Sequence, residues 1–419
     1  MREEDFSEEI TGAGGGVYIA GGWVRDAIRG AEPQDRDYVV AGITEGKFES
    51  LFPAAIRVGR RFPVYRLRVG GVVCDVAFAR SEVKSGEGYR GFDISIDPST
   101  SIREDLERRD TTINSMAVRV GSGELIDPFG GAKDIEAGVI RATSEHFRDD
   151  PVRALRAARQ AAQFGYSIER GTMRMMSECR NELKGEPAER ITRELSLALE
   201  TERPSVYFRA LLEIGLLDVT YPQLYALAGA EQDPRYHPEG DAFAHTMLVL
   251  DRTSAMSRRP EVRFAALAHD IGKGLVPIGD RPHYYDHERL GLAALADWNR
   301  RMTLPNLWRV CAEFVIKEHM RVGDISKPGK ITDFLTRLRP HPIGTDGMSA
   351  VTVADAQRLP PFLRDADEYY GAMDEISGND IPENLTGPDR GHWLRTRRIE
   401  AVTRVMLLAE GKKESSDGS

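Results

Sequence analysis

The feature that most constrains the fold lies near the start of the chain. It is a strand, a glycine turn and a helix, followed by a second strand that begins with two carboxylates. The apolar run Tyr18–Ala20 leads into Gly21, Gly22 and Trp23-Val24-Arg25-Asp26, and Asp35-Arg36-Asp37 precedes Tyr38-Val39-Val40. Alternate residues of a strand point to the same face, so Asp35 and Asp37 are expected to project together. The order of elements predicts an α/β domain with these carboxylates at a strand end.

These two features suggest one kind of chemistry. Paired carboxylates can hold two Mg²⁺ ions, and the backbone N–H groups of a glycine turn at a helix N-terminus can bind phosphate. Each feature alone is weak, because a Gly-Gly pair is usually a plain turn and Asp-x-Asp is usually a solvated strand end. Their joint order predicts a phosphoryl-transfer site.

Length, charge and cysteine content restrict the class of protein. A chain of 419 residues should divide into several domains. The acidic start lacks the apolar core of a secretory signal, no apolar run is long enough for a membrane span, and the three scattered cysteines fit a reducing compartment. We therefore expect a cytoplasmic protein without membrane contact. Because its net charge is −9, a polyanionic partner would need a local basic surface.

The hydrophobic pattern changes along the chain. Short β-rich runs alternate with turns from Val17 to about Arg141, whereas 3.6-residue periodicity dominates from Pro151 to about Ala409. Strands are expected at Val17–Ala20, Tyr38–Ala41, Val64–Val69, Val72–Ala79 and Met116–Val120. The composition also predicts a flexible leader over 1–16, a mobile loop over Ser81–Ser99 and a disordered tail over 411–419.

Two further segments carry candidate binding residues. Arg109, Asp110 and Asn114 precede a strand, where Arg109 could clamp a triphosphate and the two others could contact a ribose. Either Asp149 or Asp150 is expected to cap a helix on which three arginines form a slanted stripe, namely Arg153, Arg156 and Arg159. A carboxylate and an arginine one turn apart can read a base edge. A solvated loop and an ordinary basic helix face remain the plain alternatives.

The order of these motifs resembles the class II tRNA nucleotidyltransferases, the CCA-adding enzymes of the poly(A) polymerase head-domain superfamily. The motifs are Gly-Gly-x-Val-Arg-Asp, Asp-x-Asp, Arg-Arg-Asp-x-Thr-Ile-Asn, Asp-Pro-x-x-Gly and Asp-Pro-x-Arg-x-x-Arg, with a neck-helix motif at Pro187–Glu194. One departure is Asp149, where the family usually has Glu. The resemblance implies a mixed-sheet, polymerase-beta-like α/β nucleotidyltransferase head, an all-helical neck and body, and a helical HD domain. It divides the chain into a head (17–147), a neck with the base-recognition helix (148–225), an HD domain (226–345) and a C-terminal helical tail (346–410).

The resemblance also implies residue roles in the head and neck. Asp35 and Asp37 would be the catalytic Mg²⁺ ligands, with Asp75 either a third carboxylate or a plain strand residue. Nucleotide contacts would come from Gly22, Arg25, Arg109, Asp110, Asp150, Arg153, Arg156 and Arg159. The implied partners are tRNA, CTP and ATP.

A second constellation lies in the helical half. By resemblance to HD phosphohydrolase domains, a divalent transition metal would be held by His245, His269, Asp270, His287 and His319, with Asp355 as a further candidate and Lys273 stabilising charge. Such a site would hydrolyse a phosphomonoester or a 2′,3′-cyclic phosphate, which suits RNA repair.

The expected activity is template-independent addition of CCA to tRNA, in a monomer or homodimer. A poly(A) polymerase or A-only enzyme is the alternative, and a catalytically inactive RNA-binding protein is a second. Gly59–Tyr65 resembles the CCA-adding pattern more than the poly(A) polymerase one, and the Ser81–Ser99 loop favours full CCA addition over A-only addition.

Overall fold

The computed structural model describes residues 1–33, 36–58, 63–84, 86 and 92–417. Asp35 therefore lies outside the described residues, as do 59–62 of the Gly59–Tyr65 motif, much of the centre of the Ser81–Ser99 segment, and 418–419. The chain divides into two compact units, the first formed by Met1–Ala198 with Val206–Thr220 and the second by Leu199–Ser205 with Tyr221–Ser419.

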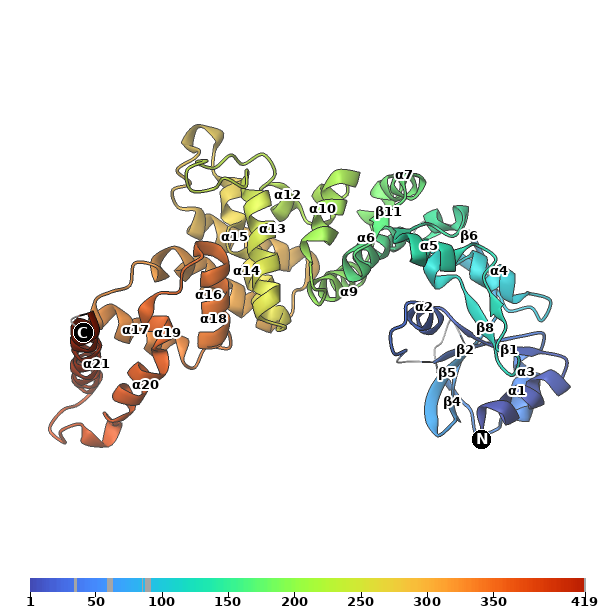
Figure 1. Cartoon of the computed structure of the whole chain (residues 1–419), viewed down its shortest axis with the longest axis horizontal. Helices are drawn as coiled ribbons and strands as arrows, with labels where there is room; N and C mark the ends of the chain where they lie inside the picture. The colour runs from blue at the N-terminus through green and yellow to red at the C-terminus, as the bar shows by residue number, and fades with distance from the viewer. Residues whose placement is uncertain (34–35, 59–62, 85, 87–91, 418–419) are drawn as a thin grey trace. The chain divides into compact units, whose positions relative to one another are not determined.

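A mixed β-sheet forms the centre of the first unit (Figure 1). Its order among the described residues is β3-β4-β5-β2-β1-β8-β9, with bounds β1 Gly16–Ala20, β2 Asp37–Ala41, β3 Ile56–Val58, β4 Val64–Val69, β5 Val72–Phe78, β8 Ala117–Arg119 and β9 Leu125–Ile126. Strands β2 and β5 pair in parallel and the other neighbours are antiparallel. The predicted mixed sheet is confirmed, because runs such as Val64–Val69 alternate buried and exposed side chains as one-sided strands do.

Aromatic side chains cover one face of this sheet. Phe48 of α3 (Glu45–Leu51) packs against Tyr65 of β4 and Phe78 of β5, with ring centroids 5.0 and 5.4 Å away. Phe6 of α1 (Glu3–Gly12) lies edge-on to Tyr38 of β2 at 5.5 Å. Helices α1 and α3 thus bury the face to which Tyr38 points.

The expected flexible leader over 1–16 is wrong. Helix α1 occupies most of it, and its Phe6 and Ile10, four residues apart on one face, are fully buried. Glu3 accepts a hydrogen bond from the Tyr38 hydroxyl, which ties the helix to β2. The glycine-rich composition suggested flexibility, but the glycines of this segment begin only at the last residue of the helix.

The opposite face of the sheet leads to the site. Val39 of β2 packs there with Ala20 of β1 and with Ile102 and Leu106 of α4 (Ile102–Glu107). Asp37 lies two residues before Val39 and so belongs to the same face. The carboxylate is thereby placed on the side away from α1 and α3.

The Ser81–Ser99 segment contains a hairpin, which corrects the expected mobile loop. Strand β6 (Ser81–Lys84) pairs antiparallel with β7 (Phe92–Ser95), in the register Ser81–Ser95 to Lys84–Phe92. The glycine and serine content suggested a loop, so the two short strands were not predicted. The backbone N–H and C=O groups of these strands hydrogen-bond to each other.

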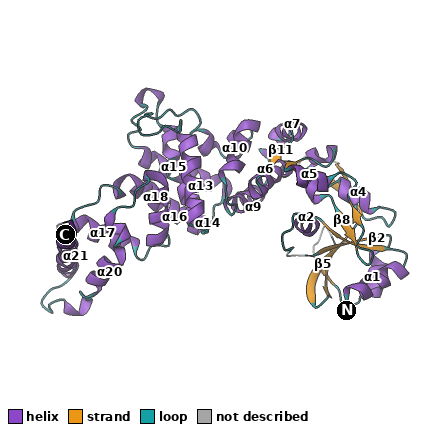
Figure 2. Cartoon of the chain, in the orientation of Figure 1, coloured by secondary structure: helices purple, strands orange, loops and turns teal. Residues whose placement is uncertain are grey.

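Helices dominate the rest of the first unit, as the periodicity predicted. Its remaining elements are α2 Gly22–Ile28, η1 Thr112–Asn114, α5 Gly131–Ala137, β10 Val139–Ile140, η2 Glu145–Asp149, α6 Val152–Phe164, β11 Ser167–Ile168, α7 Arg170–Glu178, α8 Arg180–Leu183, α9 Ala188–Leu199, α10 Ser205–Ile214 and α11 Leu217–Thr220. The short strand β11, parallel to β10, is the described exception to helix after Pro151 (Figure 2).

The second unit is helical. Its elements are α12 Pro222–Tyr225, α13 Ala242–Met256, α14 Pro260–Ala268, η3 Ile271–Leu275, η4 Ile278–Asp280, α15 His287–Met302, α16 Asn306–Val322, α17 Pro328–Leu338, α18 Gly344–Ala356, α19 Pro361–Arg364, α20 Ala366–Asp374, η5 Gly378–Asp380 and α21 Pro388–Asp417. Phe264 of the buried helix α14 contacts Trp298 of α15 and Trp308 of α16, at 5.2 and 5.1 Å between ring centroids. This aromatic cluster fixes the helices that carry the site histidines.

Two expected boundaries in this unit are wrong. Helix α18 runs unbroken through the expected border between 345 and 346, and α21 continues through residues 411–417 of the expected disordered tail. Lys412, Lys413 and Glu414 have high helix propensity, so the charged composition that suggested disorder is compatible with a helix. Among the described helices, none combines the length and apolarity that a membrane crossing requires.

Candidate functional site

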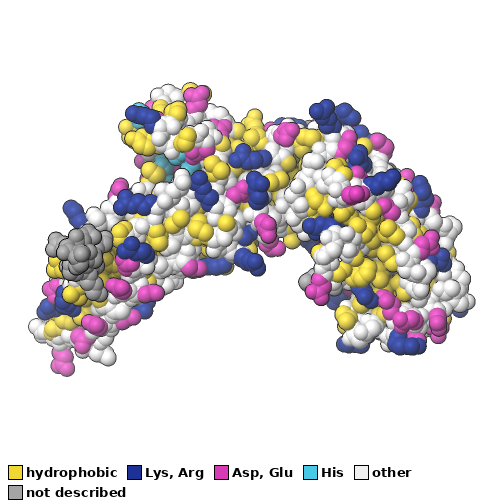
Figure 3. Space-filling model, in the orientation of Figure 1, with side chains coloured by type: hydrophobic (Ala, Val, Ile, Leu, Met, Phe, Trp, Pro, Cys, Tyr) yellow, Lys and Arg dark blue, Asp and Glu magenta, His cyan; other side chains and the backbone are white. Residues whose placement is uncertain are grey.

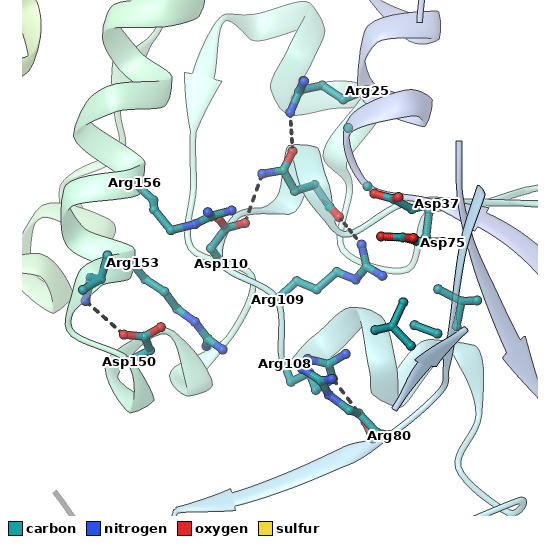
Figure 4. Close-up of a pocket in the computed structure, with 18 of the residues that line it drawn as sticks. Arg25, Asp37, Asp75, Arg80, Arg108, Arg109, Asp110, Asp150, Arg153 and Arg156 are labelled. Atoms are coloured by element: carbon teal, nitrogen blue, oxygen red, sulfur yellow. Dashed lines mark hydrogen bonds and ion pairs between the residues drawn. The ribbon is translucent and has the colours of Figure 1, made fainter. Parts of the chain in front are cut away.

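A cleft of about 720 Å³ in the first unit brings the head and neck motifs together (Figure 4). Its described lining is Ala20, Gly21, Gly22, Arg25, Asp37, Tyr38, Val39, Val64, Asp75, Ala77, Arg80, Arg108, Arg109, Asp110, Asn114, Asp150, Val152, Arg153, Arg156, Arg190, Arg193 and Glu194. Eight of these side chains are arginines and five are carboxylates. The cleft is therefore the kind of local basic surface that a polyanion requires on an acidic protein.

Two carboxylates stand side by side at one end of the cleft. Asp37 of β2 and Asp75 of β5 are direct partners in the parallel register, and Figure 4 draws their carboxylates next to each other. Asp75 also accepts a hydrogen bond at 3.2 Å from Nε of Arg66, its register partner on β4, and both of these side chains are exposed. The two carboxylates offer the oxygen ligands that Mg²⁺ prefers, so these residues fit the implied metal.

The glycine turn lies directly against Arg109. Gly21 has a φ of +81°, and a side-chain carbon there would lie 2.8 Å from Arg109 Nη1. Asp105 holds the Arg109 guanidinium from the other side, with 3.1 Å between Nη2 and Oδ2. Gly22 begins α2 and lines the same cleft. Glycine at position 21 favours this backbone conformation and leaves the space that the end of the Arg109 side chain occupies.

A partly buried hydrogen-bond network joins four residues of the predicted nucleotide site. Asp110 accepts hydrogen bonds from Arg156 Nε at 2.7 Å and from Asn114 Nδ2 at 3.1 Å. Asn114 Oδ1 in turn accepts one from Arg25 Nη1 at 2.7 Å. Burial alone would raise the pKa of Asp110, but the charge of Arg156 and these hydrogen bonds lower it well below its usual value. Asp110 is thus a carboxylate held ionised inside the protein.

Asp150 and Arg153 lie at the start of helix α6. Asp150 Oδ1 accepts from the backbone N–H of Val152, the first residue of α6, at 3.1 Å, so Asp150 rather than Asp149 satisfies a backbone donor at the start of the helix. Its other oxygen accepts from Arg190 Nη2 at 2.6 Å. Arg153 is largely buried and donates to the carbonyl of His146. Both side chains line the cleft with fixed orientations.

Arg159 is not among the described residues that line the cleft. Its Nε donates to Glu194 Oε2 at 2.6 Å, and Nη1 donates to Gln163. Successive arginines three residues apart rotate gradually around a helix, so the third member of the stripe has turned toward α9. A direct nucleotide contact by Arg159 has no support in this geometry.

Sequence reasoning missed several lining residues. Arg108 shares Asp105 with Arg109, and Arg190, Arg193 and Glu194 come from the neck-helix motif of α9. The i, i+3, i+4 spacing of the last three places them on one helix face and is the signal that could have found them.

The second candidate site lies in the helical unit. Asp270 Oδ1 is 3.5 Å from His287 Nε2 and 3.4 Å from His319 Nε2, and Asp270 Oδ2 is 3.2 Å from His269 Nε2. His245 Nε2 lies 3.9 Å from Asp270 Oδ2. The structure therefore brings together all five predicted ligands. The four histidines of this cluster are buried, although other side chains on the same unit leave some histidine atoms visible at the surface in Figure 3.

Three of these rings are oriented by the main chain. The Nδ1 atoms of His269, His287 and His319 lie 2.8 to 3.2 Å from backbone carbonyls. A carbonyl only accepts, so each Nδ1 carries a proton, and Nε2 is the ring atom that is directed toward Asp270. Within the described residues, His269 Nε2 and Asp270 Oδ1 are buried without a hydrogen-bond partner. Imidazole nitrogens and a carboxylate arranged in this way fit a divalent transition metal.

Asp355 and Lys273 complete this cluster. Asp355 Oδ1 is 3.0 Å from His245 Nε2, which places the expected further carboxylate at the site. Burial would raise the pKa of Asp355, but the hydrogen bond with His245 and the nearby His269 lower it to about 2. Lys273 Nζ lies 2.6 Å from Asp270 Oδ2. Sequence reasoning missed His237 and Glu239, which pack against His245 from the segment before α13.

Known proteins match the chain along most of its length. Family models fit in the order poly A polymerase head domain (17–141), "probable RNA and SrmB-binding site of polymerase A" (165–227) and HD domain (242–349). A multifunctional CCA protein of Methylococcus capsulatus is 37% identical over 412 residues, covering 93% of this chain and 95% of that protein. The chain belongs to the multifunctional CCA protein family. The resemblance inferred from the motifs is therefore confirmed.

Solved structures share the fold of this multifunctional CCA family member. A Bacillus stearothermophilus CCA-adding enzyme in complex with CTP aligns at a TM-score of 0.66 and 21% identity, covering 99% of this chain and 98% of its own. A Thermotoga maritima CCA-adding enzyme complexed with tRNA aligns at a TM-score of 0.60 and 20% identity, covering 97% and 94%. The predicted head, helical body and HD domain are thus those of the family, and so is the class of enzyme, a tRNA nucleotidyltransferase with an HD domain.

Proposed function

We propose that this protein adds CCA to the 3′ end of tRNA from CTP and ATP, with the cleft of the first unit as its active site. The observation that carries the proposal is one cleft that is lined by Asp37 and Asp75, by a set of arginines, and by Asp150 together with Arg153. Family membership supports the same reaction, since the relatives are multifunctional CCA proteins.

The carboxylates would bind the catalytic metal. Asp35 and Asp37 are the proposed Mg²⁺ ligands, and Asp75 is well placed to assist because it is the register partner of Asp37. When bound, two Mg²⁺ ions activate the tRNA 3′-hydroxyl and neutralise the charge of the triphosphate and of the departing pyrophosphate.

The arginines would orient the triphosphate. Arg109 is held by Asp105 beside the Gly21-Gly22 turn, close to the carboxylates in Figure 4, so its remaining N–H groups can clamp phosphate oxygens. Arg25 already donates to Asp26 and to Asn114, but a guanidinium has five N–H donors and can still contact a phosphate. Asp110, held in place by its ion pair with Arg156, would lie near the ribose.

Asp150 and Arg153 would select the base. Cytosine and adenine both present an exocyclic amine beside a ring nitrogen acceptor, whereas guanine and uracil present a carbonyl beside an N–H at the same edge. An acceptor from Asp150 and a donor from Arg153 complement the first two and oppose the others. Each Asp150 oxygen already accepts one hydrogen bond and keeps a lone pair for the amine.

The HD cluster supports a second activity. We propose that it hydrolyses a phosphomonoester or a 2′,3′-cyclic phosphate at a damaged RNA end, with the metal ligands His245, His269, Asp270, His287 and His319. A bound metal supplies an activated water as nucleophile. Lys273, paired with Asp270, carries the positive charge suited to a phosphate oxygen.

One experiment separates the candidate reactions. The protein is incubated with tRNA that lacks its 3′-terminal CCA, with labelled CTP and ATP supplied separately and together. Extension by C, C and A followed by a halt supports the proposal. A long A tail, or A addition only to a substrate that already ends in CC, supports the polymerase or A-only alternative. No incorporation of either nucleotide would leave an RNA-binding protein.

A further inference from the structure

His245 differs from the other histidines of the HD cluster in how its ring is held. His269, His287 and His319 each place Nδ1 at a backbone carbonyl of their own helix or turn. The Nδ1 of His245 instead lies 2.6 Å from Glu239 Oε1, in the segment before α13. The orientation of this ring therefore depends on a side chain that can be changed by mutation.

The hydrogen bond fixes which nitrogen of His245 faces the site. A carboxylate oxygen only accepts, so Nδ1 carries a proton, and Nε2 at the opposite end of the ring points to Asp355 at 3.0 Å and to Asp270 at 3.9 Å. Metal-bound histidines commonly donate their other N–H to a carboxylate or carbonyl, which sets the ring orientation and raises the basicity of the ligand atom.

The segment before α13 also contacts the cluster of histidines and Asp270 at a second point. Gln232 Oε1 accepts a hydrogen bond from Lys273 Nζ at 2.7 Å, and Lys273 pairs with Asp270. The ring of His237 packs edge-on against His245 at 4.6 Å and its Nδ1 lies 3.2 Å from Glu239. Residues 232–239, here called the supporting segment, thus contact His245 directly and Asp270 through Lys273.

We propose that Glu239 is a positioning residue of the HD metal site, which holds His245 with Nε2 toward the metal and increases the affinity of the site for a divalent transition metal. It does not touch the metal. The proposal concerns metal binding alone, so it can fail or hold independently of CCA addition and of hydrolysis.

A second ion between His237, Glu239 and His245 is the competing explanation, because their ligand atoms lie within 4.8 Å of one another. The 2.6 Å contact argues against it. That separation is a hydrogen-bond length, whereas two ligands at about 2.1 Å from one ion are held farther apart by tetrahedral or octahedral geometry.

The test measures Co²⁺ binding to the full-length protein by equilibrium dialysis and by the visible absorption of bound Co²⁺. Millimolar Mg²⁺ is present to occupy oxygen-ligand sites in the head, and His269→Asn gives the background. Glu239→Ala is expected to weaken binding about 10- to 100-fold. Glu239→Gln, whose amide oxygen still accepts from Nδ1, is expected to lose less. The matched control is Asp233→Ala, which removes a carboxylate of the supporting segment that bonds only within that segment in the described contacts.

A second readout reports the ring itself. In ¹⁵N-histidine-labelled protein loaded with Zn²⁺, the wild type should show a His245 Nδ1–H signal protected from exchange, identified by its loss in His245→Asn, and Glu239→Ala should lose this protection. Unchanged Co²⁺ affinity in both Glu239 variants would overturn the proposal. So would an equal loss in Asp233→Ala, or a second bound Co²⁺ that disappears in His237→Ala. If Glu239→Ala does not fold, the isosteric Glu239→Gln decides, with reduced affinity in support and wild-type affinity against.

Discussion

Asp110 and Arg156 form an ion pair, 2.7 Å between Oδ2 and Nε, that connects helix α6 to the segment following α4. The same carboxylate bonds Asn114, which bonds Arg25 on α2. Residues predicted to contact phosphate, ribose and base are therefore members of one hydrogen-bonded network. A change at Asp110 should affect both stability and nucleotide selection.

We expect Asp110→Asn to lower the free energy of unfolding by about 2 kcal/mol, the scale of a hydrogen bond to a charged group. The variant leaves Arg156 without its strongest counter-charge. Urea unfolding monitored by circular dichroism measures the change. Asp75→Asn is the control, because its pair with Arg66 is exposed and should contribute less than about 1 kcal/mol. Equal losses in the two variants would contradict the assigned role.

The contribution of Asp110 should depend on pH. Its pKa is lowered in the folded protein, so the stabilisation is complete above the unfolded-state pKa of about 4 and is lost as the pH falls toward the folded-state value. The difference in unfolding free energy between wild type and Asp110→Asn should therefore shrink below about pH 4. A difference that stays constant from neutral to acidic pH would show that the charge is not responsible.

Asp75→Asn should reduce nucleotide addition on the order of 100-fold or more without unfolding the protein. Loss of a metal-binding carboxylate removes charge stabilisation worth several kcal/mol in the transition state. Single-turnover incorporation of CMP into tRNA measures the effect. Arg66→Ala is the matched control, since Arg66 contacts the same carboxylate from outside the cleft. Near-normal rates in Asp75→Asn would show that Asp75 is a plain strand residue.

Gly21→Ala should weaken nucleotide binding more than it weakens folding. The added carbon would lie 2.8 Å from Arg109 Nη1, so the guanidinium must move. Gly30→Ala is the control, because Gly30 has a similar positive φ of +73° but no atom within 4 Å of the added carbon. Gly30→Ala should lose about 1 kcal/mol of stability. Gly21→Ala should lose about 1–3 kcal/mol, because Gly21 combines its positive φ with a ψ of −128°. Only Gly21→Ala should raise the apparent Kd for CTP, and identical CTP binding in the two would refute the contact.

His269→Asn should abolish metal-dependent phosphohydrolase activity and leave CCA addition unchanged. His269 Nε2 is a buried atom without a hydrogen-bond partner in the described structure, as expected of a ligand position. Hydrolysis of a 2′,3′-cyclic nucleotide and incorporation of CMP are measured on the same preparation. His392→Asn, a change on an exposed stretch of α21, should affect neither. Loss of both activities in His269→Asn would contradict a division into two sites.

Local sequence patterns predicted the strands of the sheet and the start of helix α6 well. The strand Val64–Val69 follows directly from alternating apolar residues, the strand Val72–Phe78 follows from a β-rich apolar run, and the hydrogen bond of Asp150 at the start of α6 follows from its place before Pro151. Spacing alone could not predict which arginines reach the cleft, because Arg159 turns to Glu194, a residue of another helix. Glu239 was missed for the same reason, because its proposed role depends on a contact with His245 and not on a sequence motif. Helix α1 was missed because a glycine run outweighed two apolar residues.

Helix α1 has a practical consequence for anyone who handles the protein. Phe6 packs against Tyr38 and Phe52 beneath the strand that carries Asp37, Ile10 is buried on the same helix, and Glu3 accepts a hydrogen bond from Tyr38, one residue from Asp37. Deleting the first dozen residues would expose the aromatic side chains beneath β2 to water and destabilise this strand. An inactive truncated preparation could then be mistaken for an inactive enzyme.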